Sequence, residues 1–100
     1  MLHHLSVLGA TYMDVHQQGG GIHYTVRETR KASYDSLTKL LQQRLWNMLH
    51  CGTLLVECKT GYGLDFDSEL KQLEVLRQSS QDMPPIDRVI TFLGAHAVPE

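Results

Sequence analysis

The chain has 100 residues, which is enough for one domain with a modest hydrophobic core but not for two. Its formal net charge at pH 7 is -2, so no broad basic field favours nucleic acid or a membrane surface as a partner. The sequence shows neither a secretory signal pattern nor an apolar stretch near the roughly 20 residues that span a bilayer. Cys51 and Cys58 lack C-x-x-C spacing. We therefore expect a soluble cytoplasmic chain with reduced thiols.

The first third of the chain is predicted to be a loop, and the next segment a helix. Residues 1–32 show no sustained hydrophobic period, and the triple glycine at 19–21 suits a backbone with positive φ angles. From Ser33 onward, apolar residues recur at helical spacing, and Gly52 follows as a stop signal. We therefore predict a helix over residues 34–50, whose apolar stripe comprises Leu37, Leu40, Leu41, Leu45, Met48 and Leu49.

Two short apolar runs, at residues 53–58 and 88–93, are predicted to be strands. Both are nearly continuous rather than alternating, which is typical of strands buried on both faces of a parallel sheet. Between them, Asp67 is expected to cap a second helix with Leu70, Leu73 and Leu76 on one stripe, and residues 79–85 end it. The predicted fold class is α/β, in one domain with a loop region over 1–32 and an αβαβ unit over 33–100.

The candidate site lies where the two predicted strands end. Ligands of parallel α/β folds bind beyond the carboxyl ends of the strands. Tyr62 follows the first strand between two glycines, and His96 follows the second, so both are expected on one rim. A phenol and an imidazole can both hydrogen-bond a ligand near neutral pH. From position alone, a second interpretation stays open, in which Tyr62 covers the sheet end and His96 bonds a nearby carbonyl.

Other motifs are less specific. Lys59-Thr60 precedes rather than follows a glycine, which is the wrong order for a phosphate-binding loop. The acidic residues at 65, 67 and 69 imitate the start of a calcium loop, but leucines stand where its glycine and bidentate glutamate belong. A zinc site at residues 50, 51 and 58 would have only three ligands without paired spacing. The basic residues Arg27, Arg30 and Lys31 are expected to belong to a solvated loop.

Three long segments resemble one enzyme family. The stretches "GATYMDVHQQGGGIHYTVRETRKAS", "GTLLVECKTGYGLDFDSELKQL" and "TFLGAHAVPE" are similar, in order and spacing, to consecutive signature segments of the imidazolonepropionases, which are metal-dependent amidohydrolases. The resemblance covers nearly the whole chain, and each segment is far longer than a simple glycine motif. It implies a (β/α)8 barrel with a small flanking β domain. By the same resemblance, Tyr62 and His96 match substrate-binding positions.

The resemblance also implies a reaction and a cofactor for the full-length family enzymes. They open the ring of 4-imidazolone-5-propanoate to N-formimidoyl-L-glutamate in histidine degradation, with one divalent metal, zinc or iron, and as homodimers. The family's metal-binding segments and catalytic base find no match here, and His3-His4 lacks the His-x-His spacing.

We therefore expect no catalytic residue and no metal ligand in this chain. We expect two strands of a partial barrel, in a fragment that is inactive alone. The alternative is a non-catalytic binding or interaction protein derived from such a segment.

Overall fold

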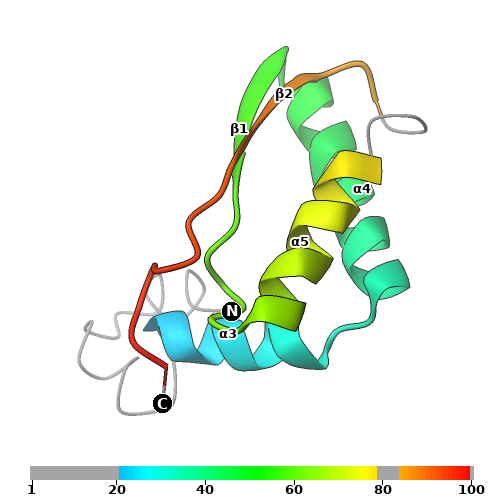
Figure 1. Ribbon diagram of the computed structural model, residues 1–100. Coiled ribbons are helices and arrows are strands. Elements are labelled where there is room, and N and C mark those ends of the chain that lie inside the picture. The colour runs from blue at the N-terminus through cyan, green and yellow to red at the C-terminus, as the bar shows by residue number, and fades with distance from the viewer. Residues whose placement is uncertain (1–20, 79–83, 100) are drawn as a thin grey trace, which may run out of the picture.

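The computed structural model describes residues 21–78 and 84–99. Its elements are α3 (Gly21–Lys31), α4 (Tyr34–His50), β1 (Leu55–Lys59), α5 (Phe66–Gln78) and β2 (Asp87–Thr91). Figure 1 shows α4 and α5 on the same side of the two strands, while α3 crosses below them near the loop that leaves β1. None of the helices in these ranges is long and apolar enough to cross a bilayer. The α/β class is confirmed, and residues 21–78 and 84–99 contain three helices instead of the predicted two.

The two strands are parallel, as predicted. They pair in register from Leu55 with Asp87 to Lys59 with Thr91. A hydrogen bond from Thr60 N to Thr91 O, 3.0 Å long, continues the ladder beyond the last strand pair. Parallel neighbours require a crossover connection, which α5 provides between β1 and β2. The carboxyl ends of both strands therefore lie at the same edge, which is the geometry on which the candidate site depends.

Only one face of this sheet is covered within the described residues, so the prediction of strands buried on both faces is wrong for them. Along β1, half-buried Val56 and Cys58 alternate with three exposed residues. Leu55 on that second face is 64% exposed, and Val89 of β2 is 54% exposed. The reason is that α4 and α5 lie on the same side of the strands. A continuous apolar strand is typical of a sheet with both faces covered, but the described helices α4 and α5 cover only one face.

Helix α4 begins and ends where the sequence indicated. Ser33 caps it, because its hydroxyl oxygen accepts a hydrogen bond from Ser36 N at 3.1 Å. At the other end, Gly52 takes a φ of 89°, which a residue with a side chain rarely adopts. Leu45 is the buried anchor of the helix, with 1% of its surface exposed. Among the described residues, Val26, Val75, Pro84 and Ile86 are also buried apolar side chains.

Helix α5 begins two residues earlier than an Asp67 cap would require, at Phe66 instead of residue 68. Asp65 is the cap: one of its carboxylate oxygens accepts from Ser68 N at 2.7 Å, and the other accepts from the Ser68 hydroxyl at 3.0 Å. The prediction that Asp67 caps the helix is therefore wrong. Asp67 instead lies in the first turn, where a carboxylate is favoured by the helix dipole.

Residues 21–31 form helix α3, so the predicted loop over 1–32 is wrong for this part; residues 1–20 lie outside the described residues. The helix is stabilised by contacts that are distant in sequence. Lys71 of α5 donates from its ammonium group to the carbonyl oxygens of Thr29, Arg30 and Ala32, at 3.1, 3.2 and 2.8 Å. A lysine at these carbonyls satisfies acceptors left free at the end of a helix. A local hydrophobic period could not reveal that partner.

Candidate functional site

The side chains of Tyr62 and His96 meet at the carboxyl ends of the strands. Their ring centroids are 5.2 Å apart, and the ring planes are inclined at 78°, which is an edge-to-face contact. This arrangement is one of the two that aromatic pairs prefer. Tyr62 is half-buried and His96 is exposed. The prediction that both residues share one rim is confirmed.

The loops that carry these two residues approach each other at Gly61. A Cβ atom placed there would lie 2.8 Å from Leu93 O and 2.9 Å from both Cβ and Nδ1 of His96. The φ angle of Gly61 is 107°, which glycine tolerates best. Glycine is thus required at this position for two reasons, the backbone conformation and the space.

Thr60 fastens the same two loops together. Its hydroxyl oxygen accepts a hydrogen bond from Leu93 N at 3.0 Å. Its side chain is fully buried, so this bond is protected from competition with water. Since Leu93 leads into the loop of His96, the bond fixes the exit of β2 relative to the exit of β1.

The carboxylate of Glu69 binds the backbone around Tyr62. Glu69 Oε1 accepts hydrogen bonds from Gly61 N at 3.1 Å and Gly63 N at 2.8 Å, and Oε2 lies 3.2 Å from Gly61 N. The residue is only 6% exposed. Burial by itself raises the pKa of this carboxyl. Hydrogen bonds from the Gly63 backbone, the Thr60 side chain and the Gly61 and Leu64 backbones outweigh that effect and lower the pKa below its ordinary value.

Arg30 joins helix α3 to this loop. Its Nε atom lies 2.7 Å from Gly63 O and 3.0 Å from Asp65 Oδ2. The pKa of Asp65 is lowered, first by the hydrogen bond from the Ser68 backbone and also by the charge of Arg30. The expectation that Arg30 belongs to a loop is therefore wrong, because it lies in helix α3, while its expected exposure to solvent is confirmed. Its neighbour Lys31 does face solvent, in an exposed ion pair with Glu28 that contributes little stability.

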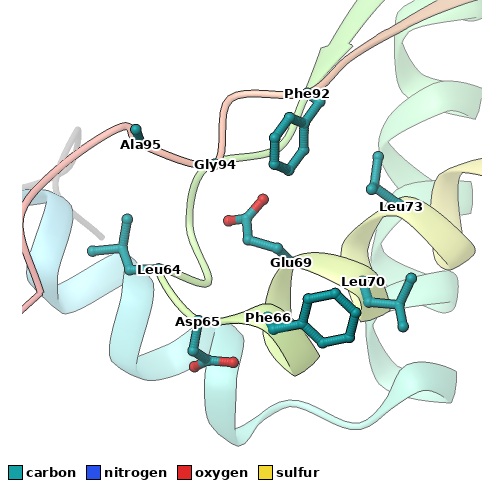
Figure 2. A pocket seen from close by; sticks show the side chains of 9 residues that line it. All are labelled: Leu64, Asp65, Phe66, Glu69, Leu70, Leu73, Phe92, Gly94 and Ala95. Atoms are coloured by element: carbon teal, nitrogen blue, oxygen red, sulfur yellow. The ribbon is translucent and has the colours of Figure 1, made fainter.

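An open pocket of about 680 Å³ lies beside the loop, between the start of α5 and the end of β2. Figure 2 shows the Glu69 carboxylate directed toward the loop, with Phe92 on one side of it and Phe66 on the other. The lining is mainly apolar and comprises Leu64, Asp65, Phe66, Glu69, Leu70, Leu73, Phe92, Gly94 and Ala95. Its two carboxylates already accept hydrogen bonds from the chain. An anionic ligand is therefore poorly matched to this pocket.

The residues do not fit a metal ion within the described ranges. No group of three or more His, Cys, Asp or Glu side chains there could hold one. Cys51 and Cys58 are both free thiols. Burial raises the pKa of the Cys58 thiol, although Arg88 acts in the opposite direction, so this sulfur stays protonated at neutral pH and is a poor ligand.

Sequence reasoning missed the residues that hold the rim together. From the sequence, Glu69 was considered only as a position of a rejected calcium loop, and Thr60 only as part of a rejected phosphate loop. One signal was available: a glutamate in the first turn of a helix follows two glycines at a distance of six and eight residues, and such a side chain can fold back onto their amides. For Arg30 and Lys71 there was no local signal, because their partners lie 33 or more residues away.

These elements define a class of protein: a parallel α/β unit whose candidate site, a tyrosine against a histidine, lies beyond the carboxyl ends of its strands. No model of a protein family matches the chain.

Individual curated proteins do match. Over 96 residues, or 96% of this chain, it is 50% identical to a "Probable imidazolonepropionase" of Homo sapiens, and 45% identical to one of Dictyostelium discoideum. A protein of the same name from Nematostella vectensis is 50% identical over 95 residues. The chain spans 22% of the length of each of these relatives. The resemblance to the imidazolonepropionases that the three signature segments indicated is thereby confirmed.

Proposed function

We propose that the chain forms part of the substrate-binding rim of an imidazolonepropionase, a hydrolase that opens the cyclic C–N amide bond of 4-imidazolone-5-propanoate. The contact between Tyr62 and His96 is the observation that supports this most directly. It joins the two residues that the family resemblance assigns to substrate, in a chain about half identical to proteins of that name. The alternative of a non-catalytic interaction protein gains no support from these relatives.

The substrate offers a ring carbonyl, ring N–H groups and a propionate. In the proposed enzyme, Tyr62 donates its hydroxyl hydrogen to a ring or propionate oxygen, and His96 donates an N–H to the carbonyl oxygen at the bond to be broken. A donor at that oxygen stabilises the negative charge that develops when water adds to the carbonyl carbon. The C–N bond then breaks: the water oxygen stays on the carbonyl carbon, which becomes a carboxylate, and a proton of the water passes to the departing ring nitrogen, which gives N-formimidoyl-L-glutamate. Tyr62 and His96 bind the substrate and stabilise its charge, while the proton transfer belongs to the family's catalytic base, for which this chain has no match.

One divalent metal, zinc or iron, belongs to the proposed complete enzyme through the family resemblance. The described residues of this chain offer it no ligand set. We expect the 100-residue chain alone to hydrolyse no imidazolone, and measurable turnover by the purified, metal-supplemented chain would contradict this. Cytoplasmic location and homodimer assembly come with the same resemblance and are part of the same proposal.

A transplantation experiment tests the proposed function. In the Homo sapiens relative, the 96 matched residues are replaced by those of this chain; we call the product the transplanted enzyme. It should be active, and Tyr62→Phe should reduce kcat/KM by an amount equivalent to about 1–3 kcal/mol, because a buried ligand group loses its partner.

The matched control is Tyr34→Phe, the same chemical change in a tyrosine whose hydroxyl bonds Gln78 away from the rim. It should leave the kinetic constants unchanged. A transplanted enzyme that is folded by circular dichroism but inactive would refute the proposal. Equal effects of the two tyrosine variants would remove Tyr62 from the site.

A further inference from the structure

We propose that Glu69 is a positioning residue, which sets the placement of Tyr62 against His96 by binding the backbone of the loop between them. This inference rests on the proposed function only where it concerns catalysis. Glu69 itself touches no substrate position. It acts through the loop that carries Tyr62.

Glu69 binds the residues on both sides of Tyr62 in the sequence. Its carboxylate accepts hydrogen bonds from the residue before, Gly61, and from the residue after, Gly63. With the amides on both sides fixed to one rigid group, the peptide units on either side of Tyr62 have little freedom to rotate. The direction in which the Cα–Cβ bond of Tyr62 leaves the backbone is thereby restricted.

The loop needs such a partner because its backbone is strained at Leu64. This residue has a φ of 59°, which is uncommon for a residue with a side chain as bulky as that of leucine. A left-handed leucine persists where surrounding contacts over-determine it. A buried carboxylate that accepts several backbone N–H groups is such a contact, because charge-assisted hydrogen bonds are roughly twice as strong as neutral ones.

The role of Glu69 differs from that of an ordinary helix cap. Asp65 already caps α5 through Ser68, and Glu69 N donates to Asp65 O at 3.0 Å as part of the helix. The carboxylate of Glu69 turns away from its own helix toward the loop (Figure 2). The close packing of Gly63 on this turn, where a Cβ would lie 2.7 Å from Glu69 N, shows how tightly loop and helix fit.

The opposite side of the contact is fixed by Thr60. Its hydroxyl accepts a hydrogen bond from Leu93 N. Thr60 also directly precedes Gly61, whose N–H is bound by the Glu69 carboxylate. The Tyr62 loop is thus held by Glu69 and is tied through Thr60 to the segment that leads to His96. A change in the Glu69 carboxylate should therefore be detected at the contact between the two rings.

The first test uses the full 100-residue chain and needs no substrate. Nuclear magnetic resonance should show cross-peaks between the ring protons of Tyr62 and His96 in the unaltered chain. Glu69→Gln keeps the shape of the side chain but offers only one acceptor oxygen and turns two N–H hydrogens toward the loop amides. The cross-peaks should fall several-fold in intensity, and the amide signals of Gly61 and Gly63 should move upfield. Glu74→Gln, the same change at an exposed position of α5, should alter neither.

Two outcomes of this test would overturn the inference. One is unchanged cross-peaks in a folded Glu69→Gln chain. The other is global unfolding, both in that variant and in Glu69→Asp, which keeps the charge but shortens the reach; Glu69 would then support the whole fold instead of the rim. The inference requires that Glu69→Asp retain the signals of α4 while weakening the cross-peaks.

The second test measures coupling in the transplanted enzyme. Glu69→Gln should lower kcat/KM by about 10-fold, the effect of one hydrogen bond to a charged group. If Glu69 acts through Tyr62, the combined Glu69→Gln and Tyr62→Phe variant should be little worse than the poorer single variant, because the two changes remove one shared interaction. Multiplying losses would overturn the inference. An inactive transplanted enzyme would refute the proposed function, while the resonance test would still decide the role of Glu69.

Discussion

Gly61 provides a quantitative test of how closely the two rim loops are packed. In Gly61→Ala, the new methyl group must occupy a space where Leu93 O and two atoms of His96 lie less than 3.0 Å away. Forcing a methyl group into filled space costs typically 1–3 kcal/mol. The φ of 107° adds backbone strain of roughly 1–2 kcal/mol or more for a residue with a Cβ. The substitution should therefore lower the free energy of unfolding by about 2–5 kcal/mol.

Gly52→Ala separates the two contributions. Gly52 also has a positive φ, 89°, but a Cβ there would meet nothing within 4 Å. Gly52→Ala should therefore lower the free energy of unfolding by the backbone strain alone, roughly 1–2 kcal/mol. Urea unfolding of the two variants and of the unaltered chain, followed by circular dichroism, measures both costs. If Gly61→Ala and Gly52→Ala are equally destabilising, the close approach of the loops does not exist and the rim geometry derived from it is wrong.

Two further outcomes follow from the charged groups. Lys71→Met should lower the stability of α3 by about 1–3 kcal/mol, because three carbonyl oxygens lose a charged donor. Hydrogen exchange should become faster in α3 but not in α4. The control is Lys39→Met, the same change at an exposed position, which should alter the exchange of neither helix. Glu69 and Asp65 have folded-state pKa values below their ordinary ones, so their stabilising effect is present above about pH 4 and is lost as pH falls through the folded values. The urea midpoint should fall over that acidic range, and less in Glu69→Gln; identical acid profiles would contradict the assignment.

The parts of the fold that depend on local sequence could be predicted. Helix α4 has a cap, an apolar stripe and a glycine stop within its own residues, and the structure places it at Tyr34–His50 as expected. The two strands were recognisable as short apolar runs, and their parallel pairing followed from the helix between them. The shared rim of Tyr62 and His96 followed in turn, because parallel strands end at one edge.

The parts that depend on distant contacts could not be predicted. Helix α3 has one buried apolar residue, Val26, and its end is satisfied by Lys71, a residue of another helix. The one-sided coverage of the strands depends on how many layers surround them, which a strand's own residues do not encode. Glu69 is a polar residue in a buried position, and only its bonds to the loop amides explain why it is there.

The uncovered face of the sheet distinguishes local order at the rim from overall stability. The bonds of Thr60 and Glu69 lie within one βαβ unit, so the rim geometry needs no further layer. Leu55 can contribute to the free energy of unfolding only if a further layer covers it, because the residue is 64% exposed in this chain. In a complete barrel its face would be covered. Leu55→Ala should change the unfolding free energy of the 100-residue chain by less than about 0.5 kcal/mol, as surface substitutions do.

In the transplanted enzyme the same change should cost about 2–5 kcal/mol, as for other buried leucines. Leu45→Ala is the matched control, because Leu45 is already buried in the chain itself and should be costly in both proteins. Urea unfolding of the two variants in both proteins gives the comparison. If Leu55→Ala has little effect in both, this face of the sheet is not covered in the complete protein, and the barrel assigned through the family resemblance is wrong. If it is costly only in the transplanted enzyme, the two strands supply a local rim whose stability depends on the rest of the barrel.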